Sequence, residues 1–187
     1  LEVVKNDKVK NYLLHVVNNQ VGSVGNYVTS VRTVCENTMR AGIAASNRKM
    51  RVWHGKDVTA NVKLACEIID VETQEFAATI EQWQKLAKAT LCKADLEKFV
   101  KRLFDVSDDA SEVSTKKLNQ IEKIVSLAFT GKGNNGSTFW DAVNGVTEYF
   151  SHNAGHNAST RLESTWFGNN AKMIQSAFDI AFDMLAI

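Results

Sequence analysis

Apolar and polar positions alternate with the two-residue period of strands in the first third of the chain. Residues 9–17 and 24–34 are rich in apolar and β-branched side chains, and the Asn, Gly and Ser residues between them are typical of a hairpin turn. Residues 49–54 alternate in the same way and predict a further strand. Between these strands, the alanine-rich residues 35–46 predict a short helix.

From residue 57 onward, apolar side chains recur every three or four positions, which is the period of amphipathic helices. The pattern predicts one long helix that begins near residue 57 and four further helices, over residues 95–103, 117–129, 139–152 and 167–187. A polar turn is expected to precede the last of them, up to residue 165. The chain contains no proline, so glycine and capping side chains must set the helix ends.

Strands followed by helices, without βαβ alternation, predict the α+β class. We expect a single domain over residues 1–187, with mainly strands in residues 1–56 and mainly helices in residues 57–187. In this fold a small antiparallel sheet from the N-terminal third packs on the mostly α-helical remainder. Because the first residue is Leu1 and not Met, we also expect the chain to be a fragment of a longer protein.

Composition and charge limit the classes of function. Of the 187 residues, 44% are hydrophobic and 23% are charged, as in an ordinary globular domain, and the net charge of +1 produces no overall field for a polyanion. Nucleic-acid binding would therefore require a local cationic patch. No apolar run approaches the roughly 20 residues that span a bilayer, so no membrane partner is expected. The widely spaced Cys35, Cys66 and Cys92 predict buried, reduced thiols in a cytoplasm.

A glycine-rich stretch at residues 130–145 approximates the phosphate-loop signature. Gly131 and Gly136 have the required spacing, but Ser137 occupies the position of the lysine and a helix precedes the loop in place of a strand. We therefore predict a helix boundary, in which Gly131 ends one helix in the left-handed conformation and Ser137 or Thr138 caps the next.

Four stretches resemble one family. STFWDAVNGVTEYFSHN (residues 137–153) and STRLESTWFGNNAKMIQSAFDIAFDML (159–185) resemble the C-terminal portion of the phage- and plasmid-like family called domain of unknown function 932. SVRTVCENTMRAGI (30–43) and RKMRVWHG (48–55) resemble the central segment of that family. The resemblance implies a mobile-element origin and a cytoplasmic setting, but no reaction.

The strongest candidate chemistry is a cationic segment around a tryptophan at residues 47–56, within a stretch from 37 to 56 that contains no acidic residue. On a strand, Lys49, Arg51 and Trp53 share one face, where cations can neutralise phosphates while an indole stacks on a base. The alternative is a charged edge strand with a buried Trp53. The predicted nucleic-acid-binding residues are Arg32, Arg48, Lys49, Arg51, Trp53 and Lys56.

A second candidate is a metal site. Glu148, His152 and His156 are spaced by four residues, which would place them on one face of a continuous helix. The alternative is a hydrogen-bond network at a helix end.

Two weaker candidates involve a thiol and a guanidinium. Cys35, with Asn37 and His54, could form a nucleophilic trio if the sheet brings them together. Arg161, placed before the expected last helix, could hold an anion.

The sequence thus favours a phage- or plasmid-derived protein that binds or anneals single-stranded DNA in replication or recombination. We expect a homo-oligomer without a cofactor, more likely a binding protein than an enzyme. The alternatives are a non-catalytic interaction or assembly protein, such as an inhibitor of host defence, and a metal-dependent nuclease.

Overall fold

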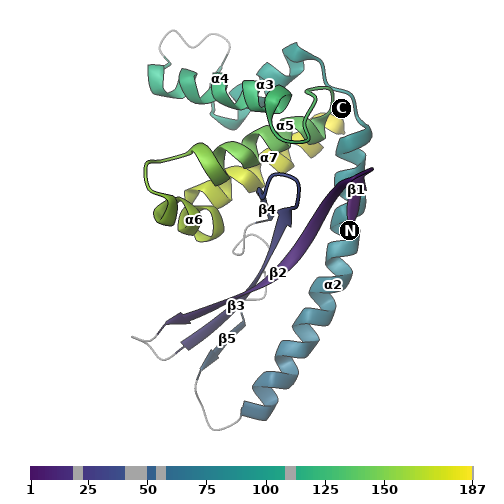
Figure 1. Ribbon diagram of the computed structural model, residues 1–187, viewed down its shortest axis with the longest axis vertical. Coiled ribbons are helices and arrows are strands. Elements are labelled where there is room, and N and C mark those ends of the chain that lie inside the picture. Colours follow the sequence, from purple (N-terminus) through teal and green to yellow (C-terminus); the bar gives the residue numbers. More distant parts are fainter. Residues whose placement is uncertain (19–22, 41–49, 54–57, 108–112, 187) are drawn as a thin grey trace.

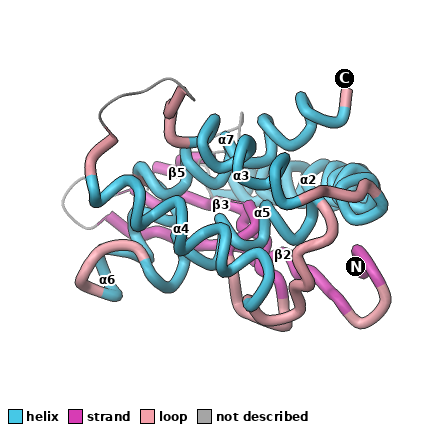
Figure 2. Tube along the Cα trace, turned by 90° about the horizontal axis from the view of Figure 1, so that it is seen from above, coloured by secondary structure: helices cyan, strands magenta, loops and turns pink. Residues whose placement is uncertain are grey.

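The α+β architecture predicted from the sequence is confirmed by a computed structural model, which describes residues 1–18, 23–40, 50–53, 58–107 and 113–186. Strands from the first third of the chain lie beside a body of helices (Figure 1). The strands and the long helix α2 extend away from this body in the same direction (Figure 1). Viewed from above, the helices of the body lie in front of the strands (Figure 2).

The sheet is antiparallel at every described pairing, in the order β1-β2-β3-β4, with β5 also on β3. β2 and β3 pair along their length, from Val9↔Arg32 to Asn18↔Ser23. β4 and β5 occupy different parts of the second edge of β3. The strands are β1 (Glu2–Val4), β2 (Asp7–Asn18), β3 (Ser23–Arg32), β4 (Thr38–Arg40) and β5 (Met50–Trp53).

The helix predicted over residues 35–46 is wrong where the structure describes it. Thr38–Arg40 forms strand β4, since pairing with Ser30 and Val31 of β3 overrides the local helix propensity. Residues 41–49 lie outside the described residues.

The remaining elements are α2 (Val58–Lys88), α3 (Lys93–Leu103), α4 (Thr115–Thr130), α5 (Phe139–Glu148), the π-helix η1 (Tyr149–Asn153), α6 (Ala158–Phe167) and α7 (Asn169–Leu185). The long helix predicted from residue 57 is confirmed as α2. The polar turn predicted up to residue 165 is wrong, because Asn157 caps α6 by accepting from the N–H groups of Ser159 and Thr160.

The core lies where α5 meets α2, α4 and α7. The Trp83 ring of α2 lies 5.8 Å from Trp140 of α5 and is stacked 5.3 Å from Phe178 of α7. Gly145 allows α4 and α5 to approach closely, because a Cβ there would lie 2.8 Å from the backbone nitrogen of Ala128. Such close contact makes α5 the central element of the helical body.

A buried ion pair joins the sheet to this body. The Arg32 side chain is fully buried, and its Nε and Nη2 donate to the Asp7 carboxylate at distances of 2.7 to 2.9 Å. Trp140 Nε1 donates to the same carboxylate at 2.8 Å, and the guanidinium lies 5.7 Å from the centre of the indole ring. The loop before α5 completes the network, because Arg32 also donates to the Gly133 carbonyl at 2.9 Å and to Asn134 Oδ1 at 2.8 Å.

We expect Asp7→Ala to lower the free energy of unfolding by about 3–5 kcal/mol, because it leaves a buried guanidinium without its counter-ion. Arg102→Ala is the matched control, since Arg102 and Asp183 form a 2.8 Å ion pair whose side chains are 50% and 63% exposed. That change should cost less than about 1 kcal/mol. Urea unfolding followed by circular dichroism measures both. Equal losses for the two variants would contradict the role given to the buried pair.

Candidate functional site

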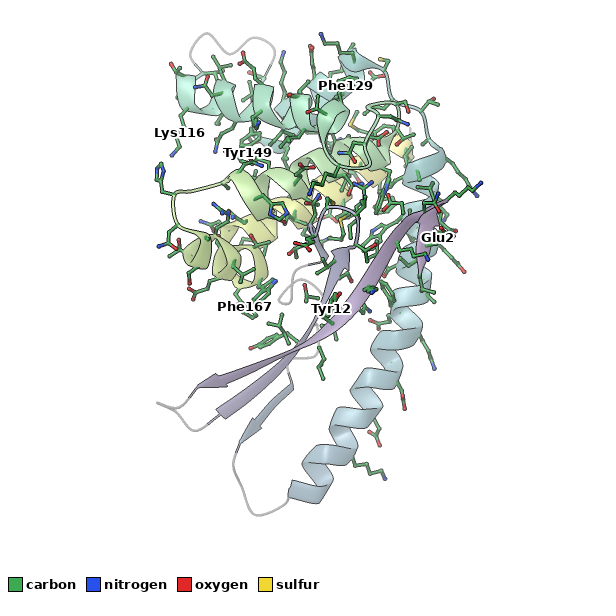
Figure 3. All side chains as sticks on the ribbon, in the orientation of Figure 1. Glu2, Tyr12, Lys116, Phe129, Tyr149 and Phe167 are labelled. Carbon is green, nitrogen blue, oxygen red and sulfur yellow. The ribbon has the colours of Figure 1, made fainter. Side chains whose placement is uncertain are left out.

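One face of the β2–β3 sheet presents aromatic and cationic side chains. Lys10 and Tyr12 are exposed on β2, and Tyr12 retains 48% of its surface. Tyr27 of β3 shares this face because it lies opposite Leu14, two residues from Tyr12. The Tyr27 ring meets Phe167 of α6 edge-on, with 5.0 Å between ring centres. Tyr12 and Phe167 are marked in Figure 3. We call Lys10, Tyr12, Tyr27 and Phe167 the aromatic face.

The register of β5 extends this face toward the predicted cationic segment. Arg51 pairs with Gly25 and Trp53 with Ser23, and both partners alternate in phase with Tyr27 along β3. The backbone therefore assigns positions 51 and 53 to the aromatic face. Gly25 leaves room there for the Tyr27 ring, since a Cβ would lie 2.7 Å from Tyr27 Cε2. The Arg51 and Trp53 side chains lie outside the described residues, as do Arg48, Lys49 and Lys56 entirely.

Arg32 was predicted to bind nucleic acid as part of the cationic patch, and the structure contradicts this prediction. It pairs with Val9 in the register, and both side chains are fully buried on the opposite face of the sheet. Its donors are directed at Asp7 and the loop before α5, so no phosphate can reach it. Strand parity accounts for the difference, because an even-numbered position on β3 lies on the opposite face from Tyr27.

The predicted metal site is also wrong. Within the described ranges, no three His, Cys, Asp or Glu side chains lie close enough to hold a metal ion. The π-helix η1 begins directly after Glu148 and ends before His156, so the four-residue spacing no longer describes one α-helical face. His152 Nε2 lies 3.0 Å from the Cys35 carbonyl oxygen, in the hydrogen-bond network that was the alternative.

The glycine-rich loop before α5 holds a carboxylate and a guanidinium of its own chain. The backbone N–H groups of Asn135, Ser137 and Thr138 donate to the Asp141 carboxylate at 3.0–3.2 Å. Thr138, one of the two caps that the sequence predicted, caps α5 and forms a capping box with Asp141. The N–H groups that a phosphate would need are therefore occupied by this carboxylate.

Gly131 differs from the prediction, because its φ of −64° is not left-handed. Within this loop the left-handed glycines are Gly133 and Gly136, at φ 76° and 74°. Gly133 is also close to the buried guanidinium, since a Cβ there would lie 2.9 Å from Arg32 Nη2.

Arg161 lies inside α6 and not in a turn at the N-terminus of the last helix, α7. Its Nη1 donates to the Ala154 carbonyl oxygen at 3.2 Å, so it stabilises the turn that follows η1.

The sequence did not identify Tyr12 and Tyr27 as candidate site residues, although the alternation of residues 9–17 and 24–34 already placed them on strands.

The family model described as domain of unknown function (DUF932) matches residues 1–177. The chain belongs to this family. The match extends over the sheet and the helical body, and so over more of the chain than the C-terminal signature. No curated protein and no solved structure matches the chain. Among the described helices of this family member, none is long and apolar enough to cross a membrane. The family description names no activity.

The thiols of this family member occupy different environments. Cys35 is buried, and loss of solvation raises its pKa more than the neighbouring Arg32 guanidinium lowers it. Asn37 donates its amide to Thr147 Oγ1 at 3.3 Å, and His54 lies outside the described residues. A protonated, buried thiol is a poor nucleophile. Cys92 was predicted to be buried but is exposed, where it caps α3 by accepting from the Asp95 N–H.

We expect iodoacetamide to alkylate Cys92 faster than Cys35 in the native protein near pH 8, because Cys92 is exposed while burial raises the pKa of the Cys35 thiol and shields it from the reagent. Peptide mass spectrometry resolves the two sites. In urea the two rates should converge. Faster modification of Cys35 than of Cys92 in the folded protein would support a nucleophilic role for Cys35.

Proposed function

We propose that this protein binds single-stranded nucleic acid, in particular single-stranded DNA, on the aromatic face. The observation that supports the proposal is the exposed Tyr12 beside Lys10, in phase with Tyr27 and with positions 51 and 53. Single-strand binders combine aromatic rings, on which bases of any sequence stack, with cations that follow the backbone. The antiparallel sheet supplies a rigid spacing for both.

In this mechanism, lysine and arginine side chains neutralise phosphates while Tyr12 and Trp53 stack on bases. Arg48, Lys49, Arg51 and Lys56 provide the charge from the segment that contains β5. Since the net charge of the whole chain is only +1, this local patch must attract the strand. Binding therefore depends steeply on salt.

The biological setting belongs to the same proposal. We infer a phage- or plasmid-derived protein that acts in replication or recombination in the cytoplasm of a host cell. A homo-oligomer suits this role, because copies that sit side by side can cover a continuous strand. The family resemblance and the sheet face support this setting together.

Tyr12→Ala should weaken binding to a fluorescent oligothymidylate about 5- to 150-fold at low salt, because one stacked base contributes about 1–3 kcal/mol. Leu13→Ala is the matched control. Leu13 is the next residue on β2 and is 42% exposed, but it belongs to the opposite face. Fluorescence anisotropy measures both. The proposal fails if Tyr12→Ala binds as well as the parent, or if Leu13→Ala loses as much affinity.

The double change Lys49→Ala/Arg51→Ala should flatten the plot of log affinity against log salt by about 1.4, since each phosphate contact on a single strand contributes about 0.7. Lys88→Ala/Lys172→Ala removes the same charge from exposed positions on α2 and α7 and should leave the slope unchanged. Identical slopes for the parent and the Lys49/Arg51 variant would show that these cations do not meet the strand.

A further inference from the structure

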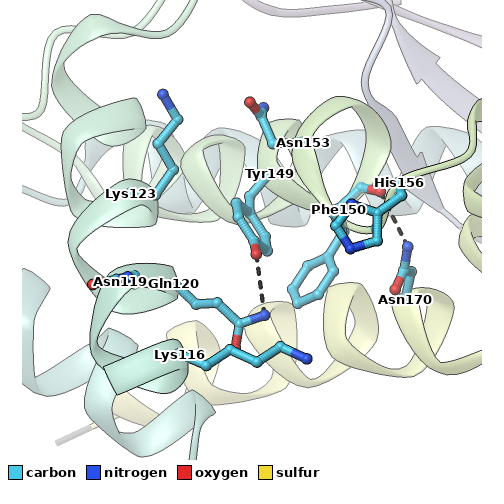
Figure 4. A pocket seen from close by; sticks show the side chains of 11 residues that line it. Lys116, Asn119, Gln120, Lys123, Tyr149, Phe150, Asn153, His156 and Asn170 are labelled. Carbon is cyan, nitrogen blue, oxygen red and sulfur yellow. Dashed lines mark hydrogen bonds between the residues drawn. The ribbon is translucent and has the colours of Figure 1, made fainter. Parts of the chain in front are cut away.

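A second concave site lies in the helical body, apart from the aromatic face. A cleft of about 850 Å³ opens between α4, η1 and the beginning of α7. Figure 4 shows Lys116 and Lys123 on one wall, Tyr149 and Phe150 in the middle, and His156 and Asn170 on the other side. Its volume is within the range of small-molecule sites. The cleft shares no residue with the aromatic face.

The charge of this cleft has one sign. Lys116 and Lys123 are seven residues apart, so they lie on the same side of α4, and both are exposed. No described residue pairs with either ammonium group, and the lining contains His156 but no aspartate or glutamate. Two lysines that have no counter-ion among the described residues attract an anion to this concave site.

The rest of the lining suits a ligand that also has a ring. Tyr149 and Phe150 are only 9% and 5% exposed and supply a rigid aromatic floor. Gln120 Nε2 donates to the Tyr149 hydroxyl at 3.1 Å, and Asn170 Nδ2 donates to the Phe150 carbonyl at 3.2 Å. These bonds fix the floor before any ligand arrives, which lowers the entropic cost of binding.

We propose that the cleft binds a phosphate monoester, with Lys116 and Lys123 paired to the phosphate and an attached ring against the Tyr149–Phe150 floor. A monoester carries a charge of about −1.5 to −2 near pH 7, which two ammonium groups match. Each phosphodiester of a nucleic-acid backbone carries only one charge. The monoester can belong to a free nucleotide or to the 5′-phosphorylated end of a strand, and the proposal does not depend on the aromatic face.

The first test is calorimetric titration of the full chain with adenosine monophosphate, inorganic phosphate and adenosine. Adenosine monophosphate should bind at least about tenfold more tightly than adenosine, and inorganic phosphate should compete with it. Lys116→Ala/Lys123→Ala should weaken the binding of adenosine monophosphate at least about tenfold. The control Lys93→Ala/Lys98→Ala removes two exposed lysines from α3 and should bind as the parent does. The proposal is overturned if adenosine binds equally well, or if the cleft variant keeps full affinity.

The second test separates the two sources of the phosphate. Oligothymidylates with a 5′-phosphate and with a 5′-hydroxyl are compared on the parent and on Lys116→Ala/Lys123→Ala. A preference for the 5′-phosphate that the variant loses identifies a strand end, whereas no preference together with nucleotide binding identifies a free nucleotide. The monoester proposal is overturned if the variant loses the same affinity for both oligonucleotides and the parent does not bind adenosine monophosphate. In that case the lysines contact phosphodiesters.

Discussion

The arrangement of this protein depends on one buried guanidinium. Arg32 at the end of β3 is held by Asp7 of β2, by the Gly133 carbonyl and by Asn134, and it lies against the Trp140 ring. A guanidinium without these partners would not remain in an apolar interior, because desolvation of a charge costs several kcal/mol. The network therefore requires the two strands, the loop and α5 to be in place at the same time, and it orients the sheet relative to the helical body.

Strand parity separates the buried ion pair from the proposed binding face of the sheet. Arg32 and Val9 are fully buried on one side of the sheet, while Lys10 and Tyr12 are exposed on the other. A shift in register by one residue would exchange the two sets and place a neighbour such as Val31 or Thr33 where Arg32 now meets Asp7. The buried pair thus fixes which residues a ligand can meet, although it contacts no ligand itself.

The sequence predicted the class of fold, the long helix α2 and the cap at Thr138, because these follow from periodicity and local hydrogen bonding. It could not predict that Arg32 is buried, since its partners Gly133 and Asn134 are about 100 residues away along the chain. The metal prediction failed because nothing in the spacing of Glu148 and His152 reveals a π-helix. The helix predicted around residue 38 failed because β3 offers a free edge that only the tertiary fold supplies.

Hydrogen–deuterium exchange on Asp7→Asn tests the central claim most directly, because this change removes the charge and keeps the shape. The buried-guanidinium account predicts a joint loss of protection in β2, in the Arg32 end of β3 and in residues 132–138, while α3 and the middle of α7 keep theirs. Loss of protection confined to the strand that carries residue 7, with the loop before α5 unchanged, would contradict the account.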